Sequence, residues 1–197
     1  LINELQRDLQ TAHDMQMALL PRESPHLDGM ELSGICIPAR HVGGDYYNFL
    51  YLDEDRTKLG IVLADVSGKG MEAAPVAMRL NEMVRYEITG RTSGVEILKG
   101  LDRSLRGRIP PEMFVTCGIG VVNVPKKTLA FASAANPEVY HYRRDEDAVR
   151  PLGVTGYPVG MTLRMEGVIL FNETRLELGS GDVLVFTSDG VEETQNS

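Results

Sequence analysis

Residues 59–64, Leu-Gly-Ile-Val-Leu-Ala, form a continuous apolar run that stops abruptly at Asp65. An apolar run of this length without polar alternation is typical of a strand that is covered on both faces. Such a strand needs a packing layer on each side, which favours a layered domain. With 197 residues, of which 43% are hydrophobic, the chain is large enough for one such domain and an appendage.

The order of the predicted elements is typical of an α+β fold. We expect strands at 32–37, 46–52 and 59–64, followed by helices at 71–88 and 94–106. Later strands are expected at residues 113–124, 128–134, 138–143, 166–171 and 182–187, with a hairpin turn at 125–127. Strands, then two helices, then more strands predict helices layered on two stacked, mainly antiparallel sheets.

Residues 1–20 are predicted to form a helix that ends at Pro21. Its apolar residues follow a spacing of three and four, and Gln16 interrupts the stripe. The stripe is too short to establish a coiled coil. Two interpretations stay open: the helix packs on its own domain, or it is a dimerisation or signalling helix that continues upstream. We therefore divide the chain into a linker helix, 1–21, and a domain, 22–197.

Composition and charge exclude several classes of protein. The net charge is −8 without a basic block, so we expect no nucleic-acid partner, because neutralising phosphates needs clustered Lys and Arg. No segment approaches the roughly 20 apolar residues of a membrane span, and no signal peptide opens the chain. The two cysteines, Cys36 and Cys117, are expected to be buried free thiols. These features predict a cytoplasmic protein without membrane contact.

Three aspartates lie beside glycines at the ends of predicted strands: Asp45 in Gly-Gly-Asp, Asp65 in Ala-Asp-Val-Ser-Gly, and Asp189 in Ser-Asp-Gly. If 46–52 and 59–64 form a hairpin, antiparallel pairing brings Asp45 and Asp65 together. Asp189 would arrive from a third strand end. Taken singly, Asp45 and Asp189 could each be a turn residue. Together the three favour a carboxylate site for Mg²⁺ or Mn²⁺, which prefer oxygen ligands.

Six segments, in order, make the chain similar to a known family. They are Gln16–Pro21, Ile37–Tyr47, Ala64–Ala74, Met113–Thr116, Tyr157–Gly160 and Phe186–Glu193. In this order they resemble the linker end and the motifs of bacterial PPM-type serine/threonine phosphatases, in the SpoIIE/RsbU-like branch. The resemblance covers essentially all of residues 16–197.

The resemblance implies an α-β-β-α sandwich with two Mn²⁺ or Mg²⁺ ions between the sheets. Asp65 would bridge both ions, with Asp45 and Asp189 as flanking ligands, and the backbone carbonyl of Val66 would also coordinate. The three aspartates would thus be catalytic through a metal-activated water, which hydrolyses phosphoserine or phosphothreonine without a phosphoenzyme.

The same resemblance implies a place in bacterial signal transduction. The usual substrates in the family are small anti-sigma-factor antagonist proteins, which connects the chain to sigma-factor regulation and the stress response. The linker helix would relay a signal from an upstream sensor or receiver domain, often through a homodimer.

The sequence departs from the family pattern at three places. Asn48 stands where a second aspartate is common, which weakens an outer role at the metal site, and Asn136 stands in place of a histidine. The chain ends at Ser197, before the expected C-terminal helix and the last strand with its further metal-binding aspartate. We therefore expect this fragment to bind its second ion poorly. The alternative function is a pseudophosphatase that binds a partner without turnover.

Overall fold

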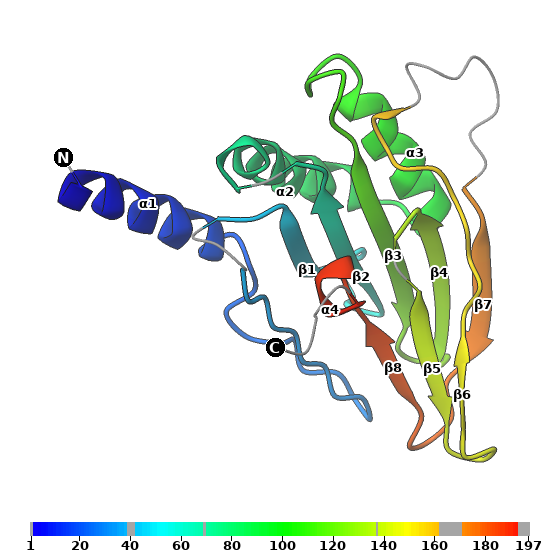
Figure 1. The fold of residues 1–197 in the computed structure, drawn as a ribbon. Helices are drawn as coiled ribbons and strands as arrows, with labels where there is room; N and C mark the ends of the chain where they lie inside the picture. Colours follow the sequence, from blue (N-terminus) through cyan, green and yellow to red (C-terminus); the bar gives the residue numbers. More distant parts are fainter. Residues whose placement is uncertain (1, 39–41, 69, 137, 162–170, 193–197) are drawn as a thin grey trace.

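A computed structural model describes residues 2–38, 42–68, 70–136, 138–161 and 171–192 of the chain (Figure 1). The elements in chain order are α1 (Ile2–Met17), β1 (Asp45–Tyr51), β2 (Lys58–Val66), the 3₁₀ helix η1 (Gly70–Glu72), α2 (Ala74–Ile88), α3 (Gly94–Leu105), β3 (Val115–Asn123), β4 (Thr128–Ala134), β5 (Val139–Arg143), β6 (Ala148–Pro151), β7 (Glu173–Glu177), β8 (Val183–Phe186) and α4 (Asp189–Glu192).

The strands form two sheets in which all neighbouring strands are antiparallel. The larger sheet has the order β1-β2-β3-β4-β7, and the smaller one has the order β6-β5-β8. Figure 1 shows α2 and α3 against one face of the larger sheet, with the smaller sheet on the other side. The predicted α+β layering of helices on stacked antiparallel sheets is confirmed.

Strand β2 is covered on both faces, as its apolar sequence predicts. Val62 and Ala64 are fully buried in the core under α2 and α3. Leu59 is fully buried in a second core between the two sheets, and Ile61 packs against that core. Because side chains alternate along a strand, Asp65 shares its face with Leu59 and Ile61 and therefore points to the space between the sheets.

The second core joins the two sheets through aromatic and aliphatic side chains. Phe131 on β4 and Phe186 on β8 meet edge to face, with ring centroids 5.7 Å apart and an interplanar angle of 78°. Such a pair is worth roughly 0.5–1.5 kcal/mol beyond the burial of its area. This contact fixes the end of β8, from which Asp189 follows three residues later.

The predicted strand at 32–37 is wrong. Residues 31–38 have irregular backbone, and Ile35 and Ile37 are each 79% exposed. The apolar residues Leu32, Ile35 and Ile37 are compatible with a strand, but within the described ranges the segment has no ladder partner in either sheet. A strand without a partner leaves its N–H and C=O groups unpaired.

The sequence analysis missed two strands, and one predicted strand cannot be compared with the structure. The edge strands β6 and β7 are only four and five residues long, and β7 is mostly charged, so neither shows an apolar pattern long enough to be recognised. The expected strand at 166–171 falls almost wholly outside the described residues. On the outer face of the smaller sheet, exposed apolar side chains remain at Tyr140, Val149, Val183 and Val185.

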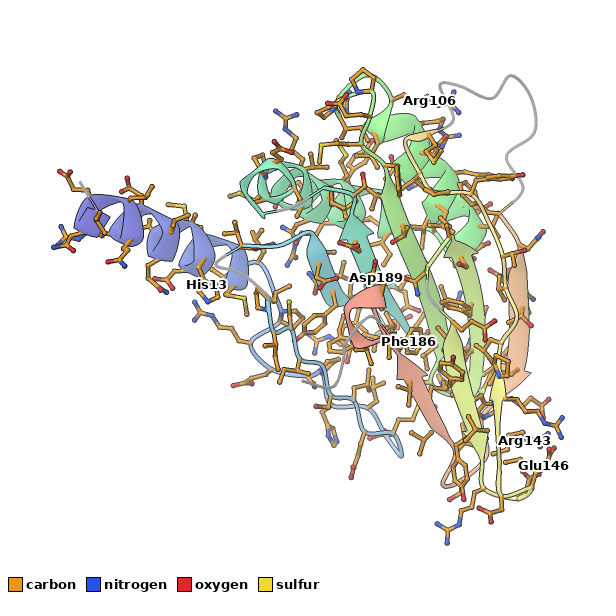
Figure 2. All side chains as sticks on the ribbon, in the orientation of Figure 1. His13, Arg106, Arg143, Glu146, Phe186 and Asp189 are labelled. Atoms are coloured by element: carbon orange, nitrogen blue, oxygen red, sulfur yellow. The ribbon has the colours of Figure 1, made fainter. Side chains whose placement is uncertain are left out.

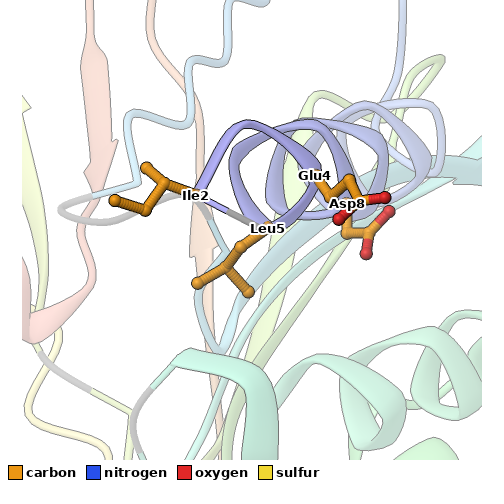
Figure 3. A pocket seen from close by; sticks show the side chains of 4 residues that line it. All are labelled: Ile2, Glu4, Leu5 and Asp8. Carbon is orange, nitrogen blue, oxygen red and sulfur yellow. The ribbon is translucent and has the colours of Figure 1, made fainter.

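Helix α1 extends away from the two sheets (Figure 1) and is mostly exposed. Ile2 and Leu5 of its apolar stripe are 73% and 61% exposed, and Gln16 is its one buried residue. Figure 3 shows a pocket near the start of α1; the described residues that line it, Ile2, Glu4, Leu5 and Asp8, all belong to that helix. The helix therefore docks on the domain through its C-terminal end.

Candidate metal centre

The hairpin of β1 and β2 places two of the predicted ligands opposite each other. Asp45 is the first residue of β1, and its Cα partner in the antiparallel ladder is Asp65, near the end of β2. This is the pairing that the sequence spacing predicts. Asp45 follows the same alternation as Phe49 and Tyr51, which pack against the core between the sheets, so both carboxylates occupy the face toward the smaller sheet.

Gly44 allows the two strand ends to approach this closely. A Cβ atom at Gly44 would lie 2.3 Å from the carbonyl oxygen of Val66 and 2.5 Å from Oδ1 of Asp65. The amide of Val66 donates a hydrogen bond to the carbonyl of Gly44 at 3.2 Å. Glycine thus leaves space beside two oxygens, the Asp65 carboxylate and the Val66 carbonyl, that the family resemblance assigns to metal binding.

The third aspartate approaches Asp45 from the smaller sheet. Figure 2 shows Asp189 at the start of α4, directly beyond the end of β8. Burial raises the pKa of Asp45 above 3.8, a hydrogen bond from the Ser188 side chain opposes that rise, and the charge of Asp189 adds to it. Two like charges at one site repel each other unless a cation neutralises them.

The oxygen atoms at this site fit a hard divalent cation. Oδ1 of Asp45 is buried and has no hydrogen-bond partner among the described residues. An unpaired buried carboxylate oxygen is costly, and a bound cation would compensate for it. Carboxylate and carbonyl oxygens are the ligands that Mg²⁺ and Mn²⁺ prefer. Within the described ranges, however, no three His, Cys, Asp or Glu side chains converge into a complete ligand cluster.

Ser67 supports the loop that follows Asp65, a role that sequence reasoning missed. Its amide donates to the carbonyl of Phe114 at 2.9 Å, and the amide of Phe114 donates back to Oγ of Ser67 at 2.8 Å. This reciprocal pair joins the Asp65 motif to the segment that leads into β3. The sequence feature that could have indicated this role is a hydroxyl residue only two positions after Asp65. A serine there can hydrogen-bond to the backbone of the turn and need not act as a nucleophile.

Asn48 lies away from the aspartates, which differs from the expectation of an outer role at the metal site. It shares the helix-facing side of β1 with Tyr46, one position out of phase with Asp45. The Asn48 amide donates to the Tyr46 hydroxyl, which donates to Oδ1 of Asn81 on α2, both at 3.0 Å. Burial raises the pKa of Tyr46 to about 12, so the hydroxyl keeps its proton. This buried network holds β1 against α2.

Both cysteines are free thiols, as predicted, but only one is fully buried. Cys117 on β3 is fully buried, and burial raises its pKa to about 12. Cys36 is half-buried; burial, together with the charge of Asp45, raises its pKa to about 11. Thiols held protonated in this way are poor metal ligands. No helix in the part of the chain that the structure describes is long and apolar enough to cross a membrane.

The stacked antiparallel sheets, the helical layer and the aspartates at strand ends define a PP2C-type domain. A family model described as stage II sporulation protein E (SpoIIE) matches residues 55–197, more than half of the chain. The chain belongs to this SpoIIE family, within the RsbU-like branch of PPM-type phosphatase domains.

Two curated relatives come from Bacillus subtilis (strain 168). The phosphoserine phosphatase RsbU is 27% identical over 194 residues, which cover 96% of this chain and 55% of RsbU. The phosphoserine phosphatase RsbP is 24% identical over 189 residues, which cover 94% of this chain and 45% of RsbP. The chain therefore spans about half the length of these relatives.

Solved structures share the fold. The SiaA-PP2C domain of Pseudomonas aeruginosa superimposes with a TM-score of 0.77 at 23% identity, covering 95% of this chain and 73% of that one. The RsbU and RsbW domains of Rv1364c from Mycobacterium tuberculosis give a TM-score of 0.65 at 27% identity, covering 77% of this chain and 40% of that one. RsbX in complex with magnesium gives a TM-score of 0.59 at 13% identity, covering 76% of this chain and 67% of that one.

Proposed function

We propose that the chain is the phosphatase domain of a metal-dependent protein phosphatase that removes phosphate from phosphoserine or phosphothreonine. The observation that carries the proposal is the pairing of Asp45 with Asp65 on the face toward β8, where a buried oxygen of Asp45 has no hydrogen-bond partner among the residues that the structure describes. Membership of the SpoIIE family supports it, and so does the similarity to two proteins named as phosphoserine phosphatases.

Four groups of this chain would hold the metal: the carboxylates of Asp45, Asp65 and Asp189 and the backbone carbonyl of Val66. Two Mn²⁺ or Mg²⁺ ions are proposed for the complete domain; the magnesium complex of RsbX, which shares the fold, is consistent with this choice. A bound divalent ion supplies Lewis-acid activation of water and neutralises charge on the phosphoryl group.

The protein's own residues would prepare this chemistry by position and charge. The β1–β2 ladder fixes the separation of Asp45 and Asp65. Ser67 and Phe114 hold the loop after Asp65. Burial raises the pKa of Asp45, and the charge of Asp189 adds to that rise. A bound divalent cation would offset both effects by neutralising the carboxylates, so these charges favour metal uptake.

We propose a phosphorylated signalling protein of the anti-sigma-factor antagonist type as the substrate, in a bacterial sigma-factor pathway. The similarity to RsbU, and to a structure that contains RsbU and RsbW domains, supports this class of partner. We also propose that α1 connects the domain to an upstream sensor or receiver domain. The same helix would mediate a homodimer.

The test measures phosphate release from a phosphoserine protein by the full-length protein with and without Mn²⁺. We expect release to require Mn²⁺ and to be lost in Asp65→Asn, while Asp28→Asn, which changes an exposed aspartate, behaves as the parent protein. Release that is independent of metal, or that persists in Asp65→Asn, would refute the proposal.

A second candidate is a pseudophosphatase that binds its partner without turnover. The specific observation in its favour is that, in the described ranges, no three acidic, histidine or cysteine side chains form a closed ligand cluster. Stoichiometric binding of the phosphoprotein with neither Mn²⁺ uptake nor phosphate release would select this candidate over the enzyme.

A further inference from the structure

Gln16 is the one buried residue of α1, and it is polar. Its side chain is 5% exposed, whereas the apolar residues Ile2 and Leu5 of the same helix are largely exposed. A buried amide needs hydrogen-bond partners to offset the loss of water. The partners of Gln16 lie 27 residues away, at Gly43.

The two groups form a reciprocal pair. Nε2 of Gln16 donates to the carbonyl of Gly43 at 2.6 Å, and the amide of Gly43 donates to Oε1 of Gln16 at 3.0 Å. A glutamine amide carries one donor group and one acceptor side by side, so it can hold both backbone groups of one residue at once. Neither an aliphatic side chain nor a carboxylate can reproduce that pattern at neutral pH.

Gly43 is two residues before Asp45, and Gly44 between them touches the other side of the site. Gly44 accepts the hydrogen bond of Val66 and leaves no space for even a methyl group beside Asp65. A shift of the Gly43 backbone would therefore be transmitted to both paired aspartates. The contacts run without a break from Gln16 through the two glycines to the carboxylates.

We propose that Gln16 is a positioning residue for the metal site: it holds the Gly43–Asp45 turn in the geometry that binds a divalent cation. This inference rests on the proposed function, because it concerns the metal affinity of the same site. It also makes that affinity depend on how α1 docks, since displacement of the helix would break both hydrogen bonds. Gln16 does not itself touch the substrate or the ion.

The test is a calorimetric titration of the metal-free full-length protein with Mn²⁺, in the absence of substrate. Gln16→Met and Gln16→Leu keep the approximate size of the side chain and remove both hydrogen bonds. Gln6→Met is the matched control, because Gln6 is on the same helix and exposed. We expect the dissociation constant for Mn²⁺ to rise about tenfold in both Gln16 variants, equivalent to about 1.4 kcal/mol, and to stay unchanged in the control.

Kinetics separate positioning from a general loss of structure. At saturating Mn²⁺ we expect kcat of the folded Gln16 variants to recover, with an unchanged KM for the phosphoprotein. Far-ultraviolet circular dichroism verifies that each variant is folded. If one of the two Gln16 variants is unfolded, the Mn²⁺ affinity of the other one tests the inference.

Mn²⁺ affinity equal to that of the parent protein in a folded Gln16 variant would overturn the inference and leave the proposed function intact. Failure of the parent protein itself to bind Mn²⁺ would overturn the proposed function instead, and the inference with it.

Discussion

A single methyl group at Gly44 should disable the site. The Cβ of Gly44→Ala would lie 2.3 Å from the Val66 carbonyl oxygen, whereas ordinary contacts begin near 3.4 Å. The strand ends must therefore separate by about 1 Å. Overpacking of this kind typically costs about 1–3 kcal/mol of unfolding free energy.

The displacement acts on function more strongly than on stability. For a domain of this size, a loss of 1–3 kcal/mol lowers Tm by roughly 2–12 °C, so we expect Gly44→Ala to remain folded at room temperature. A misplacement of about 1 Å between reacting groups can reduce the rate by about 10²-fold. We therefore expect phosphate release at fixed Mn²⁺ to fall by about two orders of magnitude.

The neighbouring glycine supplies the control. A Cβ at Gly43 would meet nothing closer than 3.9 Å, and alanine keeps the backbone groups that bind Gln16. Gly43→Ala should therefore change Tm and activity little. The measurements are thermal unfolding followed by circular dichroism and phosphate release from a phosphoserine protein. Equal effects of the two substitutions would refute the reasoning, since of these two glycines Gly44 alone lies against the oxygens of Asp65 and Val66.

Three further predictions concern charges and contacts at the site and, for Asp182, at the opposite end of β8. Asp45→Asn should raise the Tm of the metal-free protein at neutral pH. Burial raises the pKa of Asp45, so the stability that protonated Asp45 contributes is lost as pH rises above about 3.8, and asparagine avoids that loss. An unchanged or lower Tm in thermal unfolding would contradict this. Ser67→Ala should cost roughly 0.5–1.5 kcal/mol in urea unfolding, because the partly buried amide of Phe114 loses its acceptor. An unchanged free energy of unfolding would contradict this. Burial would raise the pKa of Asp182, but hydrogen bonds, including one from His141, outweigh it and hold that pKa below 3.8. Asp182→Asn should therefore be less stable than the parent protein at pH 7, and the difference should shrink as pH falls through the lowered pKa. A difference in stability that does not change with pH would contradict this.

The local elements around the site could be predicted because their signals are local. The apolar run of β2 and the turn after β1 predict a hairpin, and pairing within it places Asp45 opposite Asp65, twenty positions later in the chain. The alternation within β1 also predicts where Asn48 points. Residues 45 and 48 are an odd number of positions apart, so their side chains lie on opposite faces of the strand. The structure shows the consequence: Asn48 binds Tyr46, not the site.

The parts that could not be predicted depend on contacts between distant segments. Gln16 looked like an interruption of an apolar stripe, and only the approach of Gly43 explains why a polar residue is buried there. The apolar residues at 32, 35 and 37 predicted a strand, but a strand needs a partner, and sequence alone does not say whether one is available. The short strands β6 and β7 form at sheet edges through pairing with β5 and β4 and not through apolar pattern.

The most direct test is a comparison of Mn²⁺ binding by the full-length protein and by the variants Asp45→Asn, Asp65→Asn and Asp189→Asn, each titrated by calorimetry in the metal-free form. If carboxylates from three distant strand ends share one cation site, every substitution should weaken Mn²⁺ binding by at least about tenfold, the ratio that corresponds to about 1.4 kcal/mol. Binding that is unchanged in all three variants would contradict a site built from these aspartates.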